Sequence, residues 1–145
     1  VFASLAMDEG LIFNEEKKGL VSTMFPLLKI GNKVHESFSL KLVKHWYPDF
    51  KHTLDVDQQI SIKYERPLEM LLQVDGSFLV ETNIENFDFK NKVILVGFKG
   101  PGTEDKYRTP LRFAGKEYKK NEPDSYGLVI VANAIRTILT YRKKE

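Results

Sequence analysis

The run Val93-Ile94-Leu95-Val96-Gly97 decides the fold that we expect for this chain. A continuous apolar run closed by glycine is typical of a strand covered on both faces, because a half-exposed strand alternates apolar with polar residues. We therefore predict a central buried strand here. The glycines and proline of Gly100-Pro101-Gly102 then predict an irregular loop at its carboxyl end.

Beyond that loop, the chain is predicted to end in a long helix from about Gly127 to Tyr141. Apolar residues recur there at helical spacing: Ile130, Ala134, Ile135, Ile138 and Leu139. The basic tail Arg142-Lys143-Lys144 suits the negative end of a helix dipole. Because an aromatic residue followed by basic residues is also typical of a membrane interface, we expect this helix to lead into a transmembrane segment of a longer protein.

On the amino side, the pattern predicts a hairpin and a helix. Leu20 to Ile30 is β-like, and Gly31-Asn32 is suited to reverse the chain into a second arm. Ser37 is a candidate N-cap for a helix that Pro48 would end.

Further along, Ile60 to Tyr64 alternates strictly and predicts a half-buried strand. Another hairpin is expected around Asp75-Gly76, with arms Met70–Val74 and Phe78–Thr82. Together these elements predict an α/β fold: a mixed β-sheet with a central buried strand, hairpins and packed helices.

Length and composition place limits on the class of protein. A chain of 145 residues with 42% hydrophobic content is the size of one domain, so we expect residues 1–145 to form a single unit. With 22 Lys+Arg against 20 Asp+Glu, the net charge of +2 is too small to indicate a nucleic-acid partner.

The absence of cysteine excludes disulfides and thiolate metal sites. No run approaches the roughly 20 apolar residues of a membrane span, and the start Val1-Phe2-Ala3 suggests a fragment of a longer protein.

No motif identifies a catalytic, cofactor or metal site. Val93 to Gly102 fits neither the dinucleotide nor the P-loop spacing, so a structural loop is the favoured interpretation over phosphate binding. His45 and His52 have aspartates nearby, but Pro48 places them on different elements, and solvated loop residues explain them. No serine elbow or motif of paired carboxylates occurs. We therefore predict no catalytic residue, no cofactor and no metal.

The stretch from Phe89 to Leu139 resembles the CHASE2 family. Three parts occur in order: the lysine-led strand ending at Gly97, the loop with Asp105 and Thr109-Pro110-Leu111, and a helix bearing Ala132-Asn133-Ala134-Ile135. The amino-terminal half is a weaker match: it has Gly19-Leu20-Val21 but lacks the basic pair that usually follows in the family.

The resemblance implies a non-catalytic, extracytoplasmic sensor domain, periplasmic or on the cell surface. In an inner-membrane receptor it would follow a first transmembrane helix and control an intracellular histidine kinase, Ser/Thr kinase or nucleotide cyclase. The partners it implies are a small-molecule or protein signal and a second copy of the chain. A small α/β hydrolase or transferase domain is the alternative that the sequence leaves open.

The residues of the matched motif are the candidate ligand-binding residues: Gly97, Asp105, Thr109, Pro110 and Asn133. The polar members either hold the loop through hydrogen bonds to its backbone or line a sensing pocket at the carboxyl end of the central strand. We expect Asn133 to tie the last helix to the loop that contains Asp105 and Thr109.

Overall fold

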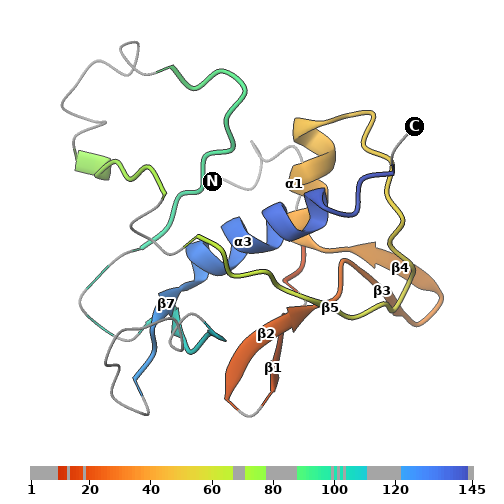
Figure 1. Ribbon diagram of the computed structural model, residues 1–145, viewed down its shortest axis with the longest axis horizontal. Helices are drawn as coiled ribbons and strands as arrows, with labels where there is room; N and C mark the ends of the chain where they lie inside the picture. The colour runs from red at the N-terminus through yellow and green to blue at the C-terminus, as the bar shows by residue number, and fades with distance from the viewer. Residues whose placement is uncertain are drawn as a thin grey trace.

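The computed structural model describes residues 10–12, 14–17, 19–66, 71–77, 88–98, 100, 102, 104–110 and 122–143. These residues form small antiparallel sheets packed against helices, which confirms the mixed α/β class (Figure 1). The last helix runs through the middle of the molecule, with a second helix against one side and the hairpins below.

The first sheet has the order β1-β2-β5. β1 (Asn14–Lys17) and β2 (Leu20–Met24) form a hairpin, and β5 (Ile60–Ser61) pairs with the other edge of β2. Past β5 the N–H of Ile62 still donates to the carbonyl of Ser22 at 2.9 Å. The predicted alternation from Ile60 to Tyr64 is confirmed in burial, although the regular strand is shorter than expected.

The second hairpin joins β3 (Leu27–Ile30) to β4 (Lys33–Glu36) and confirms the turn predicted at Gly31-Asn32. Gly31 has a φ of 60°, a conformation that costs glycine little because it has no Cβ. Directly after β4 comes α1 (Phe38–Trp46), in which Ser37 is the N-cap as predicted: its hydroxyl oxygen accepts from the N–H of Leu40 at 3.2 Å.

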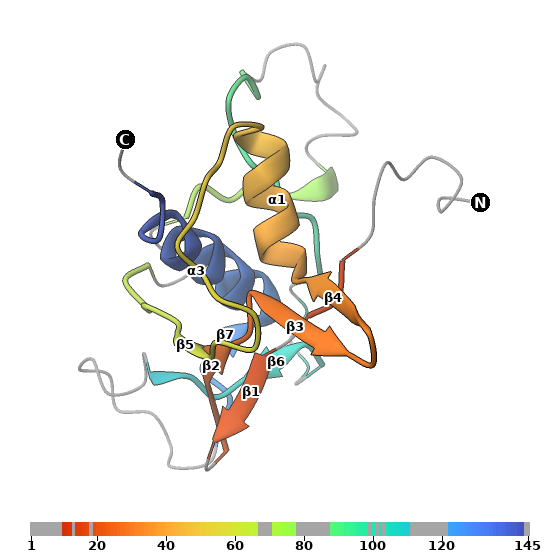
Figure 2. The same ribbon diagram turned by 90° about the vertical axis from the view of Figure 1, so that its right-hand side faces the viewer.

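The core lies between α1 and α3 (Gly127–Leu139) and extends to the sheets (Figure 2). Leu40 and Val43 of α1 and Ile138 of α3 are completely buried, as expected where two helices pack through their apolar faces. The predicted carboxyl-terminal helix is therefore confirmed. After it, Lys143 donates its N–H to the carbonyl of Lys51 at 2.8 Å, which returns the chain to the loop beyond α1.

A short hairpin leads into α3. β6 (Lys106–Tyr107) pairs antiparallel with β7 (Ser125–Tyr126), and β7 runs directly into the helix. The loop predicted to carry the sensing residues is thereby attached to the first turn of α3.

The prediction of a central strand at Val93–Val96 is wrong. These residues belong to no strand in the described part of the chain, and only Val93 and Leu95 pack against the core. Ile94 and Val96 point away from it, so the run is covered on one face only. The hairpin expected around Asp75-Gly76 falls largely outside the described residues, and residues 71–77 contain no strand.

Candidate functional site

Asp105 lies at the start of α3. It has a φ of 56°, and its carbonyl accepts from the N–H of Gly127 at 3.0 Å. Its carboxylate lies so close to the helix that a Cβ on Gly127 would clash with Oδ1. A negative charge beside the first turn of a helix is favoured by the helix dipole. Gly127 therefore leaves room for this carboxylate in its present position.

Thr109 is held by Asp124, across the hairpin from it. The Thr109 N–H and hydroxyl both donate to Oδ1 of Asp124, each at 2.9 Å, and Thr109 is completely buried. The N–H of Asp124 in turn donates to the carbonyl of Tyr107 at 3.0 Å. Pro110 follows half-buried. Asp124 thus fixes the loop that contains the predicted Thr-Pro pair.

Gly97 completes the group at the start of α3. A Cβ added to it would lie 2.9 Å from the Leu128 side chain, so this glycine allows the segment to lie directly on the first turn. Nearby, the Tyr126 hydroxyl donates to the carbonyl of Gly100 at 3.3 Å. The structure therefore brings Gly97, Asp105, Thr109 and Pro110 to the same end of α3.

The same loop is joined to the first sheet. The N–H of Val21 donates to the carbonyl of Arg108 at 2.8 Å, and the Tyr64 hydroxyl donates to the carbonyl of Val21 at 2.7 Å. Burial raises the pKa of Tyr64 well above its usual value, and the Asp124 carboxylate raises this pKa further. Tyr64 is therefore a neutral hydrogen-bond donor at neutral pH.

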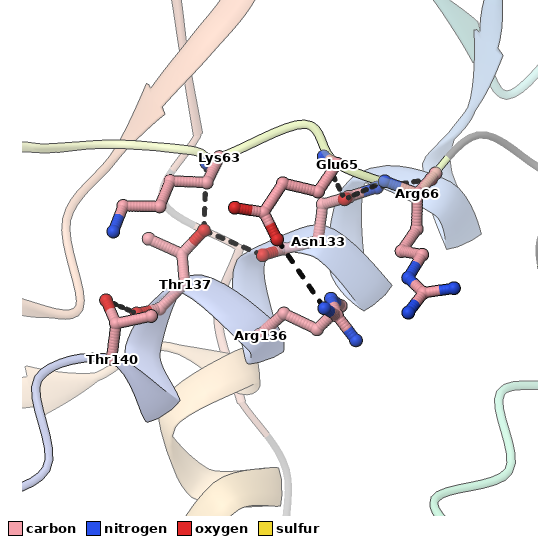
Figure 3. Close-up of polar contacts among 7 residues, drawn as sticks. All are labelled: Lys63, Glu65, Arg66, Asn133, Arg136, Thr137 and Thr140. Atoms are coloured by element: carbon pink, nitrogen blue, oxygen red, sulfur yellow. Dashed lines mark hydrogen bonds and ion pairs between the residues drawn. The ribbon is translucent and has the colours of Figure 1, made fainter.

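Asn133 is not part of this group, and the prediction that it binds the Asp105–Thr109 loop is wrong. Its side chain is completely buried and pairs with the backbone of Glu65 and Arg66 (Figure 3). Oδ1 accepts both N–H groups at 3.1 Å, while Nδ2 donates to the carbonyls of Arg66 and Val129 at 2.9 Å. Its place on α3 explains the difference, because it lies beyond the first turn and faces the chain after β5.

Thr137 continues this line of contacts one turn along α3. Its hydroxyl accepts from the N–H of Lys63 at 2.9 Å and donates to the carbonyl of Asn133 at 2.8 Å. Arg136 and Glu65 add an exposed ion pair at 3.5 Å. Two polar side chains of α3 thus take the place of a strand partner for residues 63–66 (Figure 3).

Two kinds of polar contact make up this site: Thr109 and Asp124 bind each other, while Asn133 and Thr137 bind backbone groups. In the parts of the chain that the structure describes, no cluster of three His, Cys, Asp or Glu residues is arranged to hold a metal ion. Within the same ranges, no helix has both the length and the apolar character needed to cross a membrane.

Comparison with known families supports the resemblance. The model of the CHASE2 domain matches residues 9–145, nearly the whole chain. The chain belongs to the CHASE2 family. CHASE2 domains are extracytoplasmic sensor domains of signalling proteins, found in membrane receptors, and are sensory rather than catalytic. No curated protein and no solved structure matches the chain.

The family motif of this CHASE2 domain does not indicate which residues bind Thr109 and Asn133. Asp124, the partner of Thr109, is not one of the motif residues, and neither are Glu65 and Arg66, whose backbone groups Asn133 binds. One signal was present: Asn133 and Thr137 stand four residues apart in an apolar helix and so share a face. Buried polar groups on one helix face require nearby backbone partners.

Proposed function

We propose that this CHASE2 domain is the non-catalytic, ligand-responsive part of a membrane-anchored receptor whose effector is a kinase or a nucleotide cyclase. A small-molecule or protein signal would act at the start of α3, on the loop formed by Gly97, Asp105, Thr109 and Pro110. Membership of a sensor family supports the class of function. The arrangement around α3 supports the place where the signal acts.

The main observation behind this proposal is that α3 contacts every part of the proposed signalling route. Its start touches Gly97 and Asp105, its middle is bound to residues 63–66, and the residues after it return to the loop after α1. A helix is a rigid element, and a displacement of its first turn therefore moves its other end as well. A signal that shifts the Asp105 loop would in this way change the position of Tyr141 to Lys143.

A substitution at Gly97 tests this route in the intact receptor. Gly97→Val adds a branched side chain where even a Cβ would be 2.9 Å from Leu128, so it should displace the first turn of α3. We expect effector output with and without signal to change on the order of fivefold, the lower range of allosteric coupling. Gly76→Val is the matched control, because a Cβ there meets nothing within 4 Å.

The outcome depends on comparing the two variants at equal protein level. A change with Gly97→Val and none with Gly76→Val supports a response through the start of α3. Wild-type output from a folded Gly97→Val receptor would contradict it.

A further inference from the structure

Residues 141–143, which follow α3, pair antiparallel with residues 51–53 of the loop after α1 (Figure 1). We call these two paired segments the exit tie, because they hold the chain where it leaves α3. Two backbone hydrogen bonds join them: from the N–H of Thr53 to the carbonyl of Tyr141 at 3.1 Å, and from the N–H of Lys143 to the carbonyl of Lys51 at 2.8 Å.

His52 lies at the centre of the exit tie, and its side chain faces inward. Its neighbours Lys51 and Thr53 are exposed, whereas Phe50 and Leu54 are each only 6% exposed, so the segment alternates like a strand. The His52 ring lies 6.0 Å from the Phe50 ring. Its Nδ1 atom is buried and has no hydrogen-bond partner in the part of the chain that the structure describes. A proton on Nδ1 would therefore be a buried donor without an acceptor.

Arg142 is the residue directly opposite His52 in the exit tie. The two backbone bonds lie on either side of this pair, so it is a non-hydrogen-bonded pair, the kind in which opposing side chains are closest. The Arg142 guanidinium also lies over the Tyr47 ring, 5.9 Å from its centre. Like charges directly opposite each other destabilise a strand pair. Protonation of His52 would thus place two cations opposite each other.

The other charged groups around the exit tie do not bind His52. On α3, Arg136 pairs with Glu65, and at α1 the Lys44 ammonium pairs with Glu36. No carboxylate among the described residues is bonded to the His52 ring. The remaining charged or titratable groups on the neighbouring segments are the exposed residues His45, Asp49, Lys51, Asp55 and Lys143.

We propose that the exit tie is a pH-sensitive connection, closed while His52 is neutral and opened when its imidazole takes up a proton. Histidine is the side chain that ordinarily changes its charge between about pH 5 and 8. In the open state the ring is hydrated and away from Arg142, so the open state binds more protons than the closed one. The tie is therefore stable at the upper end of this range and weakens as pH falls. Acidification would release residues 141–143 from the loop after α1, a response that goes beyond the proposed signal at the start of α3.

Amide hydrogen exchange of the whole chain tests this proposal. Thr53 and Lys143 donate the two backbone bonds, so their protection reports the closed fraction of the tie. From about pH 7.5 to about pH 5.5, with intrinsic exchange corrected for, we expect their protection to fall at least about fivefold. The N–H of Ile62, bonded to the carbonyl of Ser22, is the internal control and should change much less.

Two variants identify the titrating group. His52→Gln keeps a polar side chain that does not titrate, so the protection of Thr53 and Lys143 should become nearly independent of pH. His35→Gln is the matched control, because it removes a histidine of β4 that lies outside the exit tie and should keep the wild-type response. Arg142→Gln should reduce the response, since it removes the opposing cation.

Nuclear magnetic resonance of the histidine rings supplies a reading that needs no variant. The pH at which Nδ1 of His52 becomes protonated should coincide with the loss of protection at Thr53 and Lys143. Constant protection in the wild-type chain, an unchanged response in His52→Gln, or a protonation of His52 that does not coincide with opening would each overturn the proposal. Receptor output is not measured in these experiments, so none of these results bears on the proposed sensor function.

Discussion

The side chain of Asn133 pairs with the backbone of Arg66 in both directions. Its Oδ1 accepts from the Arg66 N–H at 3.1 Å, and its Nδ2 donates to the Arg66 carbonyl at 2.9 Å. A neighbouring strand makes the same pair of bonds in an antiparallel sheet. A single amide on α3 thus replaces a strand and fixes the helix against the chain after β5.

Asn133→Leu should destabilise the domain strongly. Leucine has a similar volume but leaves the N–H groups of Glu65 and Arg66 without their acceptor at a partly buried place. A fully buried unsatisfied group costs about 1–3 kcal/mol, so two partly buried groups should together lower the free energy of unfolding by roughly 1–3 kcal/mol. Urea denaturation measures this loss.

The neighbouring Arg136→Ala serves as the control for that experiment. Arg136 is exposed and pairs with Glu65 at 3.5 Å on the same side of α3. An exposed ion pair contributes little, and we expect a change below about 1 kcal/mol. If Asn133→Leu costs no more than Arg136→Ala, the pairing with Arg66 does not stabilise the fold.

Thr137 gives a separate test of the same contact line. Thr137→Val keeps the shape of the side chain but removes the oxygen that accepts from the N–H of Lys63, and should cost about 1–3 kcal/mol. Thr137→Ser keeps this oxygen and should retain more of the stability. Amide hydrogen exchange at Lys63 provides the direct readout: it should accelerate with valine and much less with serine. Unchanged protection in the valine variant would contradict the assignment.

Thr109→Val should loosen the loop at the start of α3. Valine loses the hydroxyl that donates to Asp124, but the backbone N–H at this position still donates to the same carboxylate. Because one bond remains, we expect a loss of only about 1 kcal/mol. Asp124→Asn should cost more, since a carboxylate is the stronger acceptor for both donors. Thermal unfolding measures the stability of both variants. A larger loss of stability with Thr109→Val than with Asp124→Asn would argue against Asp124 as the residue that stabilises this loop.

Elements that depend only on residues close together in the chain could be predicted from the sequence. Ser37 caps α1 through a bond three residues away, and the turn at Gly31 joins adjacent arms, so neither depends on distant residues. The apolar spacing of α3 is likewise a property of consecutive residues.

Contacts between distant segments could not be predicted in the same way. Asn133 lies 67 residues from Arg66, and nothing in the helix itself specifies that partner. The run Val93–Val96 was apolar enough for a strand buried on both faces, but pairing and coverage depend on other segments. Of the predicted site residues, Gly97, Asp105, Thr109 and Pro110 lie near one another because β6, β7 and the start of α3 hold them there, whereas Asn133 does not; a role in binding a signal stays a prediction for all of them.

Tyr64 should make stability fall at alkaline pH. Burial is the main cause of its raised pKa, with the Asp124 carboxylate second, so the folded protein keeps the phenolic proton at a pH where the unfolded chain loses it. Since the unfolded state then binds fewer protons, this contribution to stability is complete below about pH 10 and is lost as pH rises above it, by at most about 1.4 kcal/mol per pH unit.

Tyr64→Phe should cost about 1 kcal/mol at neutral pH through the lost bond to Val21. Above about pH 10 the deficit should shrink, because phenylalanine does not titrate. Asp124→Asn should reduce the alkaline slope less, since it removes only the smaller cause. Urea unfolding of the three proteins at neutral and alkaline pH decides the matter, and parallel stability curves for wild type and Tyr64→Phe would show that this hydroxyl does not retain its proton through burial.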